Sequence, residues 1–206
     1  MAYDKSFYEK YADYLKEETV RKSHDVAFEQ FRRIASGIVS ESLTILDLGC
    51  GLGEYCKYGE YGELFRSYVG VDKNDYSGGK FRLIIEDYHD LDKVKAECFD
   101  HYPRTAFVSL FSVECFHNAQ EKYWFYERIF DVFPTIKFGL VSGFFYESKR
   151  SQETVGETGG IISYQTIEDP LLYISDVFIE SRMYLKTPSK MFGDDVIEVW
   201  KFLVRR

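Results

Sequence analysis

One stretch of the sequence decides the fold class: Ile45-Leu46-Asp47-Leu48-Gly49-Cys50-Gly51-Leu52-Gly53. Residues 43–48 form a short apolar run that is typical of a buried parallel strand, and glycines follow it directly. Such glycines permit a tight turn and let the backbone approach a ligand at the positively biased start of the next helix. The spacing departs from the dinucleotide-binding pattern, because the third glycine comes one residue early and Glu54 stands where a glycine or alanine is usual.

Acidic side chains stand at the ends of three consecutive predicted strands. Asp47 would repel a pyrophosphate, but it would attract a ligand that carries an ammonium or sulfonium group. Asp72 comes about twenty residues after the glycines, where a carboxylate in a βαβ unit can accept hydrogen bonds from both hydroxyls of a ribose. Asp87 follows the next strand and could accept a hydrogen bond from an exocyclic amine such as that of adenine. The three carboxylates predict a site for a nucleoside with a cationic tail and no phosphates.

The remaining strand-like runs are spaced so that helices fit between them. Apolar runs at 68–71, 81–85, 106–113 and 136–146 follow the first strand, which predicts a parallel doubly wound sheet with right-handed crossovers. Asn118 and Glu121 form a capping box for a helix that extends to about residue 132, and Pro134 stops this helix. Two further strands, 177–186 and 196–204, are joined by a connection with Pro, Gly and Asp that suits a hairpin.

The two ends of this core differ in character. Residues 1–40 are predicted to be helical, because apolar residues recur at three- and four-residue steps after Ser23, which could cap the helix. Residues 147–160 are polar and lack periodicity, which predicts a long loop. We expect His24, His89 and His101 at the surface or in loops. The chain is predicted to be one domain (1–206), with a helical cap (1–40), a cofactor-binding core (43–146) and a variable loop with terminal strands (147–206).

Composition narrows the classes of function. With 206 residues, 45% of them hydrophobic, the chain has the composition of an ordinary globular domain. The net charge of -8 disfavours nonspecific nucleic-acid binding, so nucleic acid is an unlikely partner. No apolar window long enough for a membrane span and no signal peptide is present, and the four cysteines form no CxxC pair, so we expect a cytoplasmic protein with reduced thiols, no membrane partner and no metal.

Four motifs together resemble a known family. They are DLGCGLG (47–53), GVD (70–72), IEDYHDL (85–91) and VSLFSVECFHN (108–118), and their order resembles that of the class I S-adenosylmethionine-dependent methyltransferases over about residues 43–146. The resemblance implies a Rossmann-like doubly wound α/β fold with seven strands, mostly parallel with an antiparallel last strand, and a helical amino-terminal extension. Two departures stand out: Thr105-Ala106-Phe107 lacks the Asp that is often near the start of the fourth strand, and the polar loop from Glu147 replaces the usual helix after the fifth.

The same resemblance assigns S-adenosylmethionine as the cofactor. It implies that Asp47 and the glycines hold the methionine portion, Asp72 the ribose, and Asp87 with its neighbours the adenine. The cofactor-binding set it implies is Asp47, Gly49, Cys50, Gly51, Gly53, Asp72, Lys73, Asp87, Tyr88, Leu110 and, from the amino-terminal helix, Tyr11.

The chemistry of methyl transfer places few demands on catalytic side chains. Positive charge disappears from sulfur as the acceptor attacks, so alignment and water exclusion can supply much of the catalysis. If the acceptor must lose a proton, Glu114 and His117 are the best-placed bases, because both follow the fourth strand. No Asn/Asp-Pro-Pro-aromatic motif follows that strand, so we expect a small, partly apolar or aromatic methyl acceptor. A protein or tRNA acceptor, a noncatalytic cofactor-binding or regulatory module, and a nicotinamide-dependent oxidoreductase remain alternatives.

Overall fold

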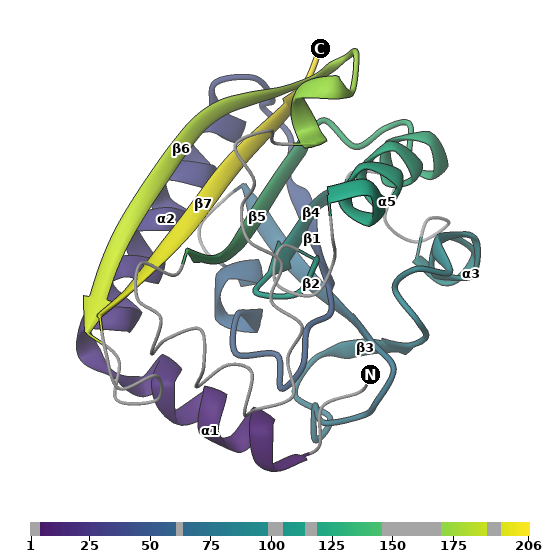
Figure 1. Ribbon diagram of the computed structural model, residues 1–206. Helices are drawn as coiled ribbons and strands as arrows, with labels where there is room; N and C mark the ends of the chain where they lie inside the picture. Colours follow the sequence, from purple (N-terminus) through teal and green to yellow (C-terminus); the bar gives the residue numbers. More distant parts are fainter. Residues whose placement is uncertain (1–4, 61–63, 99–104, 114–118, 146–169, 189–194) are drawn as a thin grey trace.

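The chain folds around one seven-stranded sheet. The computed structural model describes residues 5–60, 64–98, 105–113, 119–145, 170–188 and 195–206 (Figure 1). The strand order across the sheet is β3-β2-β1-β4-β5-β7-β6. The strands are β1 Leu43–Leu48, β2 Phe65–Asp72, β3 Arg82–Ile85, β4 Thr105–Leu110, β5 Phe138–Phe145, β6 Val177–Pro188 and β7 Asp195–Arg205.

Among the described strands, β7 is the one that runs against its neighbours. The strands from β3 to β5 pair in parallel, whereas β7 is antiparallel to both β5 and β6. This confirms the predicted seven-stranded doubly wound sheet with an antiparallel last strand. The carboxyl ends of the parallel strands therefore lie at one edge of the sheet, which is where ligands bind in doubly wound folds.

Helices cover both faces of the sheet. They are α1 Lys5–Lys16, α2 Glu18–Ser36, α3 Leu91–Cys98 and α5 Ala119–Val132, with short 3₁₀ helices η1 Cys56–Glu60 and η2 Pro170–Tyr173. Side chains of α1, α2 and η1 share one apolar core with the sheet, and those of α3, α5 and η2 share the other. In Figure 1, α2 lies behind β6 and β7, and α1 crosses the edge at which β6 ends. The protein is thus a three-layer α/β/α structure.

The central strand β1 shows how alternation assigns side chains to the two cores. All six of its residues are buried, as expected for a strand covered by helices on both faces. Leu43 and Ile45 belong to the core under α2, whereas Leu46 and Leu48 belong to the core under α5. Because successive side chains point to opposite faces, Asp47 falls on the face that α1 and α2 cover.

Several predicted boundaries differ from the observed ones. Ser23 does not cap a helix, because α2 already begins at Glu18 and the Ser23 hydroxyl donates instead to the Thr19 carbonyl oxygen (3.0 Å) within the helix. The fourth strand ends at Leu110 and not at residue 113. Its end has a local cause: Phe111 has a φ of 52°, a left-handed conformation that turns the chain out of the sheet. The predicted cap Asn118 and the polar loop 147–160 lie outside the described residues.

Candidate functional site

The glycine loop after β1 adopts a conformation that other residues rarely reach. Gly49, Gly51 and Gly53 have φ values of 80°, 52° and 68°. Two of them also sit in close contact with neighbours: a Cβ on Gly49 would lie 2.2 Å from the Ser112 Oγ, and one on Gly53 would lie 1.9 Å from a ring carbon of Phe81. Both the backbone conformation and the available space therefore select glycine at these positions.

Asp72 ties this loop to the end of β2. One carboxylate oxygen accepts a hydrogen bond from the Gly51 backbone N–H (2.9 Å), and the other accepts one from the Asn74 N–H (3.1 Å). The side chain is almost fully buried, and this burial raises the pKa of Asp72 although the backbone N–H donors act to lower it. Asp72 therefore lies beside the glycines, where the sequence predicted it, with its orientation fixed by the backbone of the loop itself.

Asp47 is a buried carboxyl group next to Asp72. The Tyr68 hydroxyl donates a hydrogen bond to Asp47 Oδ2 from the adjacent strand β2. Burial, together with the negative charge of Asp72, raises the pKa of Asp47 to about 7, although the hydrogen bond from the Tyr68 hydroxyl acts to lower it. A cation bound here would favour the ionised carboxylate. The sequence analysis did not identify Tyr68 as a partner of Asp47. Tyr68 stands two residues before Gly70, and Gly70 pairs with Asp47 in the sheet.

The loop after β3 brings the third predicted carboxylate together with two basic side chains. Asp87 forms ion pairs with Lys73 Nζ and His89 Nδ1, each at 2.7 Å. Partial burial acts to raise the pKa of Asp87, but the hydrogen bonds from Lys73 and His89 outweigh it and hold the pKa at about 2. Tyr88 stacks on His89, and its ring would lie 3.4 Å from a Cβ on Gly49. This loop therefore borders the glycine loop, and Asp87 stays ionised. His89 lies in the loop, as predicted.

The structure describes the side chains of some of the other residues that were predicted to bind the cofactor, but not of all. Cys50 and Leu110 are buried in the apolar core under α2, so their side chains pack against the protein. Burial raises the pKa of the Cys50 thiol well above its usual range. Tyr11 belongs to α1, but its side chain is outside the described part of the structure. Glu114 and His117 also lie outside the described residues, so their catalytic roles stay predictions.

A buried polar cluster of Tyr14, His24, Tyr55, Glu198 and Trp200 lies at the same edge of the sheet, and the sequence analysis missed it. The predicted surface position of His24 was wrong, because this side chain is only 3% exposed and its Nε2 lies 3.1 Å from both carboxylate oxygens of Glu198. Burial follows from the helical spacing of His24 with Phe28 and Phe31 on one face of α2. Glu198 shares one face of β7 with Trp200 and Phe202, and an acidic residue at alternate spacing with two large aromatic residues was the available signal.

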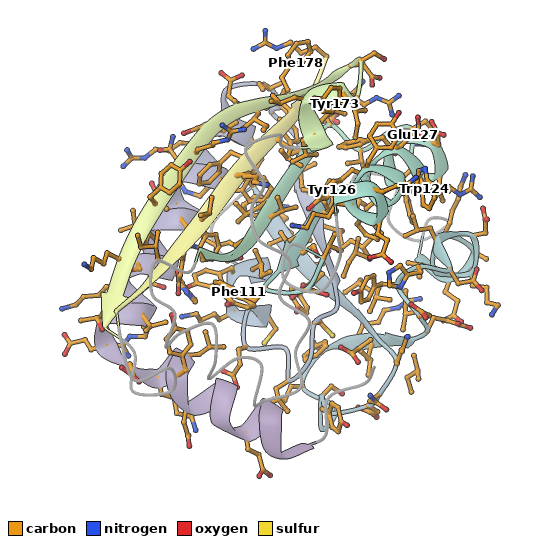
Figure 2. All side chains as sticks on the ribbon, in the orientation of Figure 1. Phe111, Trp124, Tyr126, Glu127, Tyr173 and Phe178 are labelled. Carbon is orange, nitrogen blue, oxygen red and sulfur yellow. The ribbon has the colours of Figure 1, made fainter. Side chains whose placement is uncertain are left out.

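Phe111 connects this cluster to the end of β4. Its ring lies 5.7 Å from the His24 ring, nearly parallel to it, and 5.6 Å from the Trp200 ring in an edge contact. Its backbone N–H donates to the Ser142 carbonyl oxygen of β5 (2.9 Å). Figure 2 places Phe111 on the side of the sheet toward α1, whereas Trp124 and Glu127 on α5 lie on the opposite side. Phe111 has a left-handed backbone conformation, and non-glycine residues in this conformation cluster at functional sites.

Comparison with solved structures confirms the predicted fold. The plantazolicin methyltransferase BpumL in complex with S-adenosylhomocysteine is similar to this chain with a TM-score of 0.61 and 14% identity, covering 98% of this chain and 91% of that one. The chain has the class I methyltransferase fold. Magnesium protoporphyrin IX methyltransferase from Synechocystis PCC 6803 has a TM-score of 0.53 and 12% identity, with 98% and 95% of the two chains covered.

A third similar structure with this fold is the N-methyltransferase NodS from Bradyrhizobium japonicum WM9, with a TM-score of 0.54, 11% identity and coverage of 91% of this chain and 89% of that one. No family model matches the sequence, and no curated protein matches it. None of the helices in the described part of the chain is long and apolar enough to cross a membrane.

Proposed function

We propose that this protein is an S-adenosylmethionine-dependent methyltransferase that acts on a small-molecule acceptor. The observation that carries the proposal is the pair of buried carboxyl groups beside the glycine loop: Asp72 accepts from the Gly51 N–H, and Asp47 is a neighbour that shares its burial. Two carboxylates beside the glycine loop would repel the phosphate groups of a nucleotide. They suit a ligand with a cationic group and vicinal hydroxyls.

Three acceptor carboxyl groups suit three parts of the proposed cofactor. Asp47, whose pKa is raised to about 7, gains its ionised form when the amino group of the methionine portion binds beside it. Asp72 is held at the end of β2, where a carboxylate accepts from ribose hydroxyls. Asp87, ionised and bordered by the Tyr88 ring, offers an acceptor and an aromatic surface for adenine. Several similar structures were solved with S-adenosylhomocysteine, the product of this cofactor, which supports the assignment.

The cofactor supplies a methyl group on a sulfonium, and the protein's task is to align it with the acceptor. The glycine loop and Asp72 fix one side of the site, and the buried aromatic side chains around Phe111 exclude water from the other. A small-molecule acceptor is favoured because two similar structures are, by their names, methyltransferases of plantazolicin and of magnesium protoporphyrin IX. We further propose that residues 1–206 act as one domain in the cytoplasm.

Thermal shift with defined ligands tests this function. At a concentration a hundredfold above its dissociation constant, a ligand adds about 2.7 kcal/mol to the free energy of unfolding. For a chain of this size, that corresponds to a rise in Tm of about 5–10 °C. We expect S-adenosylhomocysteine to produce this rise and NAD to produce none. Stabilisation by NAD alone would replace the proposal with an oxidoreductase.

A further inference from the structure

The buried polar cluster, defined as Tyr14, His24, Tyr55, Glu198 and Trp200, centres on a carboxylate with no exposed surface. Glu198 accepts hydrogen bonds from the Tyr14 hydroxyl (2.5 Å), the Trp200 indole N–H (3.0 Å) and His24 Nε2 (3.1 Å). On the far side of the imidazole, His24 Nδ1 lies 3.3 Å from the Tyr55 hydroxyl. A carboxylate, an imidazole and a hydroxyl therefore form one continuous hydrogen-bonded chain.

This cluster lies between the glycine loop and the ends of the central strands. Glu198 on β7 pairs with Phe144, one residue before the end of β5, so it belongs to the carboxyl edge of the parallel strands. Tyr55 follows the glycine loop by two residues, and Phe111, directly after β4, packs on the His24 ring. The cluster thus spans the space between the cofactor loop and the ends of β4 and β5, the place at which this class of fold binds its ligands.

An ionised Glu198 would select which nitrogen of His24 carries the proton. An ionised carboxylate can only accept, so the contact between Nε2 and both oxygens of Glu198 requires a proton on Nε2. In a neutral imidazole, Nδ1 then carries the lone pair and accepts from the Tyr55 hydroxyl. A carboxylate that orients an imidazole, which in turn accepts from a hydroxyl, is the order of groups that removes a proton in nucleophile activation.

We propose that Tyr55, His24 and Glu198 form a proton relay for the methyl acceptor, an inference that rests on the proposed function. As the acceptor's lone pair forms its bond to the methyl carbon, the C–S bond breaks and its electron pair stays on sulfur. The acceptor's N–H or O–H proton passes to the Tyr55 oxygen, and the Tyr55 proton passes to His24 Nδ1. Glu198 stabilises the imidazolium that results, and this proton later leaves to solvent. Tyr55 is the catalytic residue of the relay, and His24 and Glu198 act through it.

Nuclear magnetic resonance tests the first requirement in the wild-type protein, and one variant serves to assign the signals. With only four histidines in the chain, ¹⁵N-histidine labelling resolves each ring, and His24→Gln identifies the resonances of His24. In the complex with S-adenosylhomocysteine, we expect His24 to carry its proton on Nε2 and to have an unprotonated Nδ1. A proton on Nδ1 in the neutral ring would overturn the relay, because that nitrogen could not accept from Tyr55.

A pair of cofactor analogues tests whether the relay faces the methyl group. Sinefungin carries an amino group on carbon in place of the methylated sulfur, whereas S-adenosylhomocysteine carries nothing beyond the sulfur. By titration calorimetry, we expect Tyr55→Phe to weaken sinefungin binding about tenfold more than S-adenosylhomocysteine binding, through loss of a hydrogen bond to a charged group. A purely structural role would weaken both ligands equally, and an unchanged ratio of the two dissociation constants contradicts the proposal.

Tyr58→Phe is the matched control. Tyr58 is equally buried and stands three residues away, but its hydroxyl donates to Asp25 outside the cluster, so this variant should leave the ratio at the wild-type value. If the wild-type protein binds neither analogue, the proposed function itself fails. If it binds both and the ratio does not respond to Tyr55→Phe, only the relay fails.

Discussion

Replacing Asp47 with asparagine separates the charge of this residue from its shape. The Asp47→Asn side chain keeps an oxygen that can accept from the Tyr68 hydroxyl, but it does not titrate. In the wild-type protein without ligand, burial is the main cause that raises the pKa of Asp47 from 3.8 to about 7. Any part of the pH dependence of stability that comes from this carboxyl group must therefore disappear in Asp47→Asn.

The sign follows from proton linkage. Between about pH 4 and pH 7, the folded protein keeps a proton on Asp47 that the unfolded chain has lost, so raising the pH lowers the free energy of unfolding. At 1.36 kcal/mol per pH unit, the whole interval amounts to about 4 kcal/mol. Two of these units lie between pH 5 and pH 7, so the effect between pH 5 and pH 8 is about 3 kcal/mol. Relaxation around the carboxylate makes this an upper limit.

Urea denaturation at pH 5 and pH 8 measures this effect. We expect Asp47→Asn to gain up to about 3 kcal/mol relative to wild type when the pH rises from 5 to 8. The constant cost of burying the new amide N–H₂ group cancels in this comparison, as do other titrating groups that both proteins share. A stability difference between the two proteins that stays constant from pH 5 to pH 8 would refute a raised pKa at Asp47.

Ligand binding should respond in the opposite sense to stability. Because the amino group of S-adenosylhomocysteine would favour the ionised carboxylate, wild-type affinity should fall by up to tenfold per pH unit below pH 7. Asp47→Asn should bind about ten- to hundredfold more weakly at pH 8 and lose this pH dependence. Titration calorimetry in buffers of matched ionic strength provides both measurements.

Two further substitutions address the loop beside Asp47. Asp72→Ala should weaken S-adenosylhomocysteine binding by about ten- to hundredfold in calorimetry, since it removes a charged acceptor and leaves the Gly51 N–H without this partner; an unchanged affinity would place the ribose elsewhere. Gly53→Ala should lower the free energy of unfolding by about 1–3 kcal/mol through contact with the Phe81 ring, in addition to backbone strain. Gly78→Ala, with a φ of 58° and no neighbour within 4 Å, carries the strain alone, and an equal loss in both variants would contradict the steric explanation.

The strands and the glycine loop could be predicted because their determinants are local. The six residues of β1 are apolar except for Thr44 and Asp47, and the predicted range 43–48 is the observed one. The glycines of the loop mark its turn because glycine, which has no Cβ, adopts positive φ values without steric cost. The end of β4 was not predictable in this way, since apolar residues continue past Leu110 at Phe111 and Val113, and the strand ends where Phe111 takes a left-handed φ.

Hydrophobic period and turn chemistry depend on neighbouring residues, so the succession of strands along the chain, the glycine turn and the carboxylates Asp47, Asp72 and Asp87 could be predicted from local sequence. The contacts of these groups depend on how distant segments pack together. His24 and Glu198 are 174 residues apart in sequence, and they meet because α2 and β7 bury the same face of the sheet. Burial of the Asp47 carboxyl group, and therefore its raised pKa, likewise arises from packing between segments that no local pattern connects.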